Sequence, residues 1–184
     1  MSPRAYFADD PGELSLDGTW FFDYHRSDPN PDVNPELAFE QPFVPETETI
    51  DVPSHWVLRG EGRWGAPAYT NVDFPFPVDP PFPPEENPVG DYSRRFTCPE
   101  SWLTSGGQVR LRFEGVESQI IVWVNGQWIG MARGSRLAHE FDITQALVPG
   151  ENTVTLRVHQ FSAGSYLEDQ DQWWLPGVFR SVSL

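Results

Sequence analysis

The run Gln119-Ile-Ile-Val-Trp-Val-Asn-Gly-Gln-Trp-Ile-Gly130 gives the clearest indication of the fold class. Its first half, residues 119–124, is apolar on both faces, which is typical of a central strand of a sheet. Asn125-Gly126 then separates two apolar runs. Because both central residues of a tight hairpin turn need positive φ, Asn-Gly is the strongest short hairpin signal. The run therefore predicts two antiparallel strands joined by a two-residue turn.

Strand patterns continue on both sides of this hairpin. The run Gln108-Val-Arg-Leu-Arg-Phe-Glu114 alternates strictly between apolar and polar residues, as a half-buried strand does. Thr153-Val-Thr-Leu-Arg-Val158 alternates in the same way, with Val154, Leu156 and Val158 directed inward, and it follows a turn at residues 149–152. Residues 178–184 are expected to form a last strand.

The remaining segments agree with an all-β fold. Residues 14–22 predict an early strand that is interrupted by an Asp17-Gly18 turn. Only residues 100–103 and 144–147 are short helical candidates. Several short strands separated by turns predict a β-sandwich of two antiparallel sheets.

Two Pro-rich stretches are expected to be long loops. Residues 25–49 are polar and rich in proline, and residues 64–91 hold eight prolines with four aromatic residues between them. Structureless loops of this length are uncommon in compact domains and are often functional. An aromatic-packed connector or an oligomer contact is the alternative. We expect residues 1–13 to form an irregular arm and residues 14–184 to form the sandwich domain.

Composition excludes several classes of function. The chain of 184 residues carries 27 acidic and 12 basic residues, a formal charge of -15. Nucleic acids and anionic membranes both require a basic surface, so neither is an expected partner, whereas a neutral sugar is compatible. Cys98 is the only cysteine, which excludes an intrachain disulfide and fits a cytoplasmic location. No signal peptide and no membrane-spanning segment is predicted.

The segment Ser165-Tyr-Leu-Glu-Asp-Gln-Asp-Gln-Trp-Trp174 has the most chemical content. It holds three carboxylates, Glu168, Asp169 and Asp171, flanked by aromatic residues. Carboxylates accept hydrogen bonds from sugar hydroxyls, and aromatic faces cover the C–H patches of sugar rings. Clustered carboxylates also suit hard cations. The alternative is a loop whose acids are solvated and whose tryptophan pair anchors it to the core.

No complete catalytic site is predicted. Glycosidases need two carboxyl groups, about 5 Å apart in retaining enzymes, and no second segment offers an opposing acid. The four histidines, His25, His55, His139 and His159, lack metal-ligand spacing. Hydrolase, phosphate-binding and dinucleotide-binding motifs are also missing. The residues therefore predict a sugar-handling module without catalytic residues of its own.

Six motifs together resemble the amino-terminal domain of bacterial β-galactosidases in glycoside hydrolase family 2. They occur in the family's order, and the resemblance covers roughly residues 14–184. The motifs are Val52-Pro-Ser-His-Trp56, Ala68-Tyr-Thr-Asn-Val72, Pro80-Pro-Phe-Pro-Pro-Glu-Glu-Asn-Pro88, Phe113-Glu-Gly-Val-Glu-Ser118, Val122-Trp-Val-Asn-Gly126 and Gly164-Ser-Tyr-Leu-Glu-Asp-Gln-Asp171.

The resemblance implies a jelly-roll, galactose-binding-like sandwich and a set of site residues. In the family, the residues that match Asn71 and Asp171 contact the galactosyl group, and the latter also helps to ligate a sodium ion completed by residues of a catalytic barrel. Arg133 and Ala163 fall where relatives carry magnesium-binding side chains. A cation and a methyl group are poor ligands, so no magnesium site is carried over. Trp173-Trp174-Leu175 is bulkier than expected and is predicted to reshape one wall of the sugar site.

The expected function is that of the non-catalytic first domain of a retaining β-galactosidase, whose catalytic glutamates lie on a (β/α)₈ barrel absent from this chain. The end of the sequence inside or at the end of a strand fits a domain cut from a longer protein. Expected partners are a weakly bound galactoside and the other domains of the same enzyme, and the full-length enzyme is expected to be a homo-oligomer. Two alternatives stay open: a free-standing carbohydrate-binding module, and a structural or assembly domain whose loop 75–88 mediates subunit contact.

Overall fold

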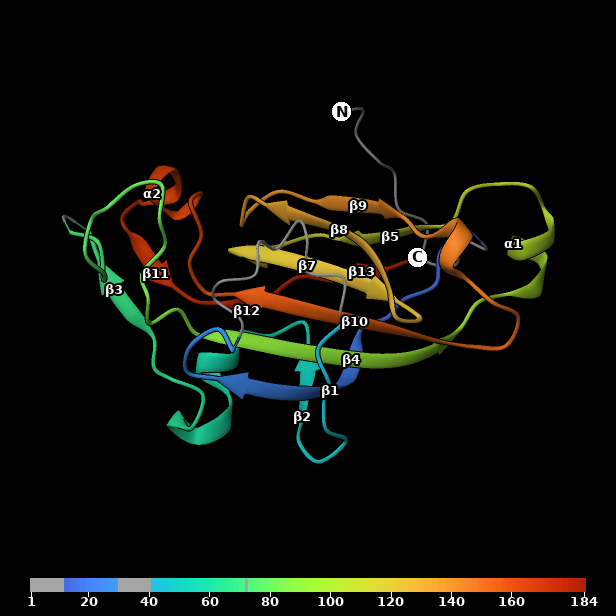
Figure 1. The fold of residues 1–184 in the computed structure, drawn as a ribbon, viewed down its shortest axis with the longest axis horizontal. Helices are drawn as coiled ribbons and strands as arrows, with labels where there is room; N and C mark the ends of the chain where they lie inside the picture. The colour runs from blue at the N-terminus through green and yellow to red at the C-terminus, as the bar shows by residue number, and fades with distance from the viewer. Residues whose placement is uncertain (1–11, 30–40, 72) are drawn as a thin grey trace.

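The computed structural model describes residues 12–29, 41–71 and 73–184. The largest of its sheets has six antiparallel strands in the order β2-β1-β4-β10-β7-β8 (Figure 1). These strands are β1 (Gly18–His25), β2 (Thr49–Val52), β4 (Val89–Thr97), β7 (Gln119–Val124), β8 (Gln127–Arg133) and β10 (Glu151–His159).

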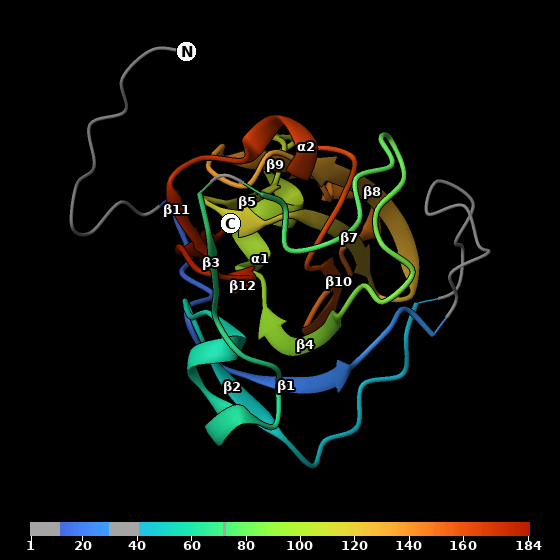
Figure 2. The same cartoon turned by 90° about the vertical axis from the view of Figure 1, so that its left-hand side faces the viewer.

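A second layer faces this sheet and completes the sandwich. It consists of a three-stranded sheet in the order β13-β5-β9 and of the pair β12-β6. Figure 2 shows the two layers on either side of the core. The strands are β5 (Arg110–Phe113), β6 (Val116–Glu117), β9 (His139–Asp142), β12 (Gly177–Val178) and β13 (Val182–Ser183). The expected all-β sandwich of antiparallel sheets is therefore confirmed.

The smaller elements lie at the two ends of the sandwich. A two-stranded ribbon of β3 (Ala68–Thr70) and β11 (Gln172–Trp174) lies at one end beside helix α2 (Ser165–Glu168) (Figure 1). Helix α1 (Glu100–Thr104) lies at the other end. Three short 3₁₀ turns complete the elements: η2 (Trp56–Leu58), η3 (Gly60–Gly62) and η4 (Thr144–Ala146).

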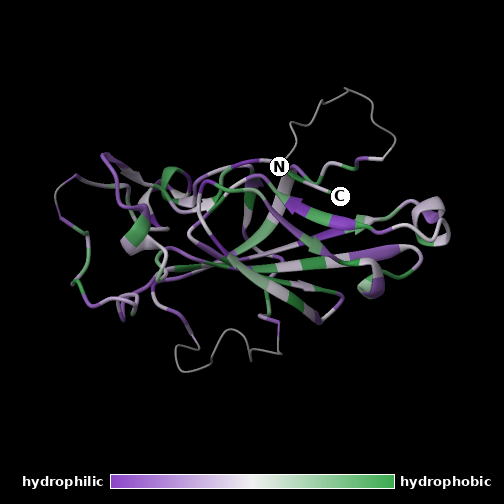
Figure 3. Ribbon diagram, turned by 90° about the horizontal axis from the view of Figure 1, so that it is seen from above, coloured by the Kyte–Doolittle hydropathy of each residue, from purple (hydrophilic) through white to green (hydrophobic). Residues whose placement is uncertain are grey.

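The core lies between the two layers and is built by the residues that alternate inward. Val154, Leu156 and Val158 of β10 are fully buried, as are Leu111 and Phe113 of β5. The hydrophobic colour in Figure 3 accordingly concentrates on the strands that cross the middle of the molecule. Burial of apolar surface at about 25 cal/mol per Å² is the main stabilising term of such a core.

The predicted hairpin is confirmed. Asn125 and Gly126 have φ values of 52° and 80°, so both adopt the left-handed conformation that the turn requires. The Asn125 amide also donates to the Ala146 carbonyl at 2.8 Å and accepts from the Thr153 amide at 2.9 Å. Asn125 therefore adopts the backbone conformation of the turn and also connects the turn by hydrogen bonds to Ala146 and Thr153.

Both chain ends differ from the predicted strands. The early strand begins only at Gly18, because Leu14 and Leu16 pair instead with Leu184 and Val182 of the second layer. The chain thus changes sheets at the predicted Asp17-Gly18 interruption. The single strand expected over residues 178–184 is broken into β12 and β13.

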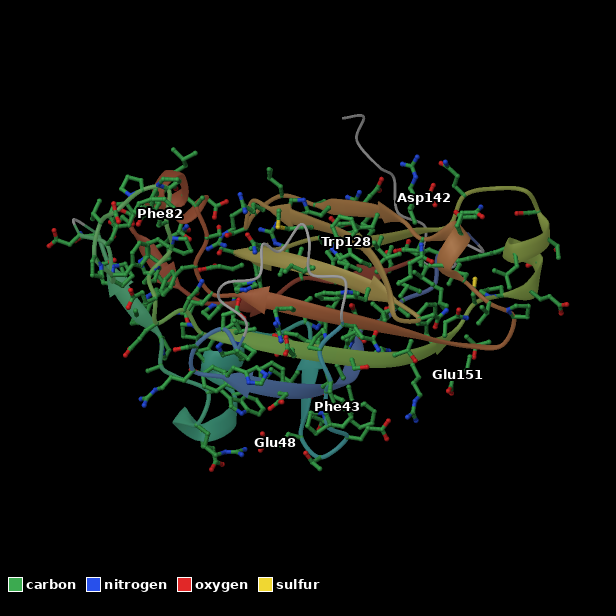
Figure 4. The ribbon with its side chains drawn as sticks, in the orientation of Figure 1. Phe43, Glu48, Phe82, Trp128, Asp142 and Glu151 are labelled. Carbon is green, nitrogen blue, oxygen red and sulfur yellow. The ribbon has the colours of Figure 1, made fainter. Side chains whose placement is uncertain are left out.

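The Pro-rich stretch over residues 64–91 is not structureless, which corrects that expectation. It contains strand β3, and Phe76 is buried against Phe161 and Trp174 in a small second core. Phe82 of the same stretch is exposed and lies at this end of the molecule (Figure 4). Of the polar loop expected over residues 25–49, residues 30–40 lie outside the described part, and so do residues 1–11 of the expected arm. No helix among the described residues is long and apolar enough to cross a membrane.

Candidate functional site

The β3–β11 ribbon brings together the two site residues expected from sequence. Its register pairs Thr70 with Gln172 and Tyr69 with Trp173. The next position beyond this ladder is Asn71 on one strand and Asp171 on the other. Both residues are exposed. Two residues far apart in the sequence therefore occupy neighbouring positions at the same end of the ribbon.

The ribbon has an inner and an outer face, because successive side chains of a strand point to opposite sides. On the inner face, Trp174 is buried and its indole N–H donates to the Thr70 hydroxyl at 2.9 Å. The outer face carries the exposed rings of Tyr69 and Trp173. By the same alternation, Asn71 shares the side of Tyr69, and Asp171 shares the side of Trp173. We call Tyr69, Asn71, Asp171 and Trp173 the outer face of the ribbon.

The Tyr69 hydroxyl donates a hydrogen bond to the Asp171 carboxylate at Oδ1. This hydrogen bond is the main reason why the pKa of Tyr69 is raised above its ordinary value of 10.0, since only the protonated phenol can donate. Desolvation and the negative charge of Asp171 act in the same direction. The phenol therefore remains a donor at neutral pH, and it uses one acceptor site of the carboxylate oxygen Oδ1.

The other acids of the run make different contacts. The Glu168 carboxylate, at the end of α2, accepts hydrogen bonds from the Ser135 amide at 2.9 Å and from the Ser135 hydroxyl at 2.5 Å. One oxygen of Asp169 is buried and has no hydrogen-bond partner among the described residues. Glu168 thus fastens the acidic run to the segment after β8, whereas Asp171 alone of the three acids is exposed.

A hollow of about 240 Å³ lies beside the ribbon. Trp173 and Trp174 form part of its wall, and the flanking glutamines Gln170 and Gln172 line it as well. Its remaining lining residues are Glu117, Ser118, Ser135, Arg136, Leu137, Leu167 and Glu168. The tryptophan pair thus forms a wall next to the predicted sugar site.

Glu117 is the most buried acid of this hollow. Burial raises the pKa of its carboxyl group, and the Arg136 guanidinium, which donates to it at 2.7 Å, opposes that rise. The Leu175 amide donates to the same carboxylate at 3.1 Å. Glu117 therefore connects the end of β11 to the loop that carries Arg136.

Ligands for a cation are sparse in the described part of the chain. No group of three or more His, Cys, Asp or Glu side chains there is arranged to hold a metal ion. Asp171 offers hard carboxylate oxygens of the kind that such cations prefer, so its side chain has the donor type expected of a sodium ligand. Arg133 donates to Gln119 at 2.6 Å, and neither Arg133 nor Ala163 offers a side-chain oxygen.

Sequence reasoning placed Trp173 only in a bulky wall of the sugar site, and it did not identify Tyr69 as a site residue. Both fall inside motifs noted from the sequence, but residues 64–91 were expected to be a loop. The signal that could have found them is the alternation of Tyr69 with Asn71 and of Asp171 with Trp173, which becomes meaningful only once both segments are known to be paired strands.

Comparisons with known proteins agree with this architecture. The profile of the family described as "Glycosyl hydrolases family 2, sugar binding domain" matches residues 14–184. The β-galactosidase of Arthrobacter sp. (strain B7) is 50% identical over 192 residues, which cover 98% of this chain and 19% of that protein. The β-galactosidase of Pectobacterium atrosepticum is 46% identical over 169 residues, which cover 92% of this chain and 16% of that protein.

Solved structures show the same fold at low identity. The β-glucuronidase of an uncultured Clostridium sp. superimposes with a TM-score of 0.64 at 20% identity, over 98% of this chain and 30% of that one. The β-glucuronidase of Faecalibacterium prausnitzii gives a TM-score of 0.64 at 19% identity, over 97% of this chain and 32% of that one. The chain thus spans less than a fifth of the length of the β-galactosidases to which it is similar. From the family match over residues 14–184 it follows that the chain belongs to glycosyl hydrolase family 2, as a sugar-binding domain of that family.

Proposed function

We propose that this chain is the non-catalytic first domain of a retaining β-galactosidase and contributes Asn71 and Asp171 to the galactose subsite. The observation that carries the proposal is the β3–β11 register, which puts these two residues at neighbouring positions on an exposed ribbon. Identities of 45–50% to bacterial β-galactosidases support the choice of galactosides among the substrates of the family.

The chemistry of the two side chains suits a sugar. The Asn71 amide offers both a donor and an acceptor to hydroxyl groups. The Asp171 carboxylate accepts from hydroxyl groups and can bind a cation at the same time. Hydrogen bonds that strengthen in the transition state lower the barrier to glycoside hydrolysis. The catalytic carboxyl groups and the other sodium ligands would come from the rest of the enzyme.

The cellular setting is part of the proposal. We place the enzyme in the cytoplasm, because the only cysteine of this chain, Cys98, is buried and unpaired in a fold that needs no disulfide. The other domains of the same enzyme are the expected partners of this chain, within a homo-oligomer.

The first test uses the chain alone. Purified chain is expected to leave a chromogenic β-galactoside unhydrolysed. Hydrolysis that co-purifies with the chain through repeated chromatography would contradict the proposal, since it would require a pair of catalytic carboxyl groups within these 184 residues.

The second test places the chain in a complete enzyme. The matching segment of the Arthrobacter β-galactosidase is replaced by this chain, and Asn71→Ala and Asp171→Asn are introduced into the chimera. Each change is expected to lower kcat/KM by about 10–100-fold, the loss of one hydrogen bond involving a charged or well-placed polar group. Gln127→Ala, at an exposed position in the hairpin, is the matched control. Unchanged kcat/KM in both site variants would refute the proposal.

A free-standing carbohydrate-binding module is the second candidate, because Trp173 and Tyr69 give the chain an exposed aromatic pair. Calorimetry of the isolated chain with galactose and lactose separates the two functions. Millimolar or tighter binding favours the module, and weaker binding favours a domain that completes its site with the rest of an enzyme.

A further inference from the structure

Trp173 is the one exposed tryptophan among the eight in the sequence, all of which the structure describes. Five of the others are buried and two are partly buried, whereas 54% of Trp173 is exposed. Its cross-strand partner Tyr69 is 48% exposed. Two large rings that stay in solvent do not contribute the stabilisation that burial of their apolar surface would give. Exposed apolar surface of this kind is typical of contact sites.

The two rings form one continuous aromatic surface. Their centroids are 5.4 Å apart, with an angle of 44° between the ring planes. The surface is held from two sides, because Tyr69 is hydrogen-bonded to Asp171 and the buried Trp174 ties the inner face of the ribbon to Thr70. The rings are therefore positioned before any ligand arrives, which reduces the entropy cost of binding.

We propose that Tyr69 and Trp173 complete the sugar-contacting face that begins with Asn71 and Asp171: the Trp173 indole packs against a C–H face of the pyranose ring, and Tyr69 positions the Asp171 carboxylate. The inference rests on the proposed function and adds two residues to it. Asn71 and Asp171 address the hydroxyl groups of the sugar, but hydroxyl groups occupy only part of its surface.

The surface of a pyranose ring has a polar part and an apolar part, and these match the polar and the aromatic side chains of the outer face. The ring has a rim of hydroxyl groups and faces that carry C–H groups. In galactose the axial hydroxyl at C4 projects to one side, which leaves the opposite side rich in C–H. The face of an indole carries the negative part of its quadrupole and attracts such groups. A β-galactoside can therefore rest on Trp173 while its hydroxyl groups reach Asn71 and Asp171.

Tyr69 acts through Asp171. Because its hydroxyl donates to Oδ1, one acceptor site of that oxygen is used and the rotation of the carboxylate is restricted. The second oxygen, Oδ2, keeps both of its acceptor sites for a sugar hydroxyl or a cation. Tyr69 is accordingly a positioning residue, and Trp173 is a residue that determines specificity.

The test is an NMR titration of the 184-residue chain with methyl β-D-galactoside, followed at the amide signals and at the indole N–H signals. Saturable shifts are expected at Asn71, Asp171 and the Trp173 indole. Trp173→Ala should weaken binding about fivefold or more, the value of roughly one aromatic contact. Trp173→Phe retains a ring and should restore part of the affinity. Phe43→Ala is the matched control, because the Phe43 ring is 85% exposed and lies away from the β3–β11 ribbon (Figure 4).

Tyr69 is tested separately with Tyr69→Phe, which retains the ring and removes only the hydroxyl. We expect a loss of affinity of about fivefold, and we expect no further loss when the same change is made in Asp171→Asn. A purely structural role of the hydroxyl would give the same loss in both backgrounds. Retained spectral dispersion in each variant shows that the fold is intact.

The outcomes separate the inference from the proposed function. If Asn71→Ala and Asp171→Asn weaken binding but Trp173→Ala, Trp173→Phe and Tyr69→Phe bind like the wild type, the inference is overturned and the proposed function stands. If only Trp173→Ala loses binding, the chain binds sugar without the expected galactose subsite and the proposed function fails. The absence of any shift in the wild type at the solubility limit of the sugar overturns the inference as well.

Discussion

The guanidinium group of Arg157 donates two hydrogen bonds to the carboxylate of Asp91, each 2.8 Å long. The two residues lie directly opposite each other on β10 and β4. Asp91 is 1% exposed and Arg157 is 8% exposed, so the ion pair is buried within the larger sheet. His25 and Asp28 extend it, since His25 lies 3.1 Å from Asp91 and Asp28 lies 3.5 Å from Arg157.

This pair predicts a marked non-additivity of mutations. Removing one partner leaves the other charge buried without compensation, so Asp91→Leu and Arg157→Met are each expected to cost about 3 kcal/mol or more. The double variant should cost less than the sum of the two, by about 1–3 kcal/mol. Urea unfolding of the four proteins measures the cycle. Strictly additive losses would mean that the pair is not coupled.

His25 makes the stability of the domain depend on pH. Its pKa is raised above 6.5, mainly by the hydrogen bond to Asp91, whereas burial acts in the opposite direction. A histidine whose pKa is raised on folding stabilises the native state fully below the unfolded pKa, and this stabilisation is lost as pH rises through the folded pKa. The stability difference between wild type and His25→Asn should therefore be greatest below about pH 6.5 and should shrink toward alkaline pH.

Unfolding curves recorded from mildly acidic to mildly alkaline pH check this dependence. In an Asp91→Asn background the effect of His25→Asn on stability should vary much less with pH, because the main cause of the pKa shift is gone. A stability difference that grows with rising pH would contradict the assignment.

The central strands can be predicted from the sequence, because the patterns that indicate them lie within a few neighbouring residues. Asn125-Gly126 needs only its own backbone conformation to define a hairpin, and the alternation at Val154, Leu156 and Val158 reports a core face. The other face of β10 is different. Arg157 alternates with these residues and would be expected in solvent, yet it is buried against Asp91, a residue 66 positions away.

The short strands of the candidate site are not predictable in this way. Strands β3 and β11 are three residues each, and what makes them strands is their pairing with each other. Asn71 and Asp171 were found through motifs of a family, not through any local pattern. Likewise, nothing local distinguishes the buried Trp174 from the exposed Trp173, because the difference lies in which face of the ribbon packs on Phe76 and Phe161.

The Pro-rich stretch contains one buried phenylalanine, Phe76, and one exposed phenylalanine, Phe82, which should affect stability differently. Phe76 is buried against Phe161 and Trp174, so Phe76→Ala is expected to destabilise the domain by about 3–5 kcal/mol. Phe82 is 65% exposed, and Phe82→Ala should change stability by less than about 0.5 kcal/mol. Thermal unfolding of both variants tests this difference.

A change at Phe82 can test whether loop 75–88 mediates contact between subunits. A change at Phe76 would disturb the ribbon itself, whereas Phe82→Ser removes an exposed ring and leaves the second core intact. If the loop mediates subunit contact, sedimentation of Phe82→Ser should show a smaller mass than the wild type. An unchanged mass would remove the assembly alternative.

Arg136 and Glu117 give the last prediction, since they link the hollow beside the ribbon to the strand that carries Trp173. Burial raises the pKa of Glu117 above 4.5, and Arg136 opposes the rise. A carboxyl group whose pKa is raised on folding costs no stability below the unfolded pKa, and the cost develops as pH rises through the folded pKa. Arg136→Ala removes the opposing charge, so it should raise the pKa of Glu117 further and make the unfolding free energy fall more steeply above about pH 4.5. Arg136 is more than a third exposed, which reduces the expected loss of stability at neutral pH to about 1–3 kcal/mol.

Unfolding in denaturant across this pH range measures the loss. When Arg136→Ala is combined with Glu117→Gln, the pH dependence of the loss should disappear, because the group that titrates is then gone. A loss that is the same at every pH would assign the effect of Arg136 to its packing over Phe179 instead.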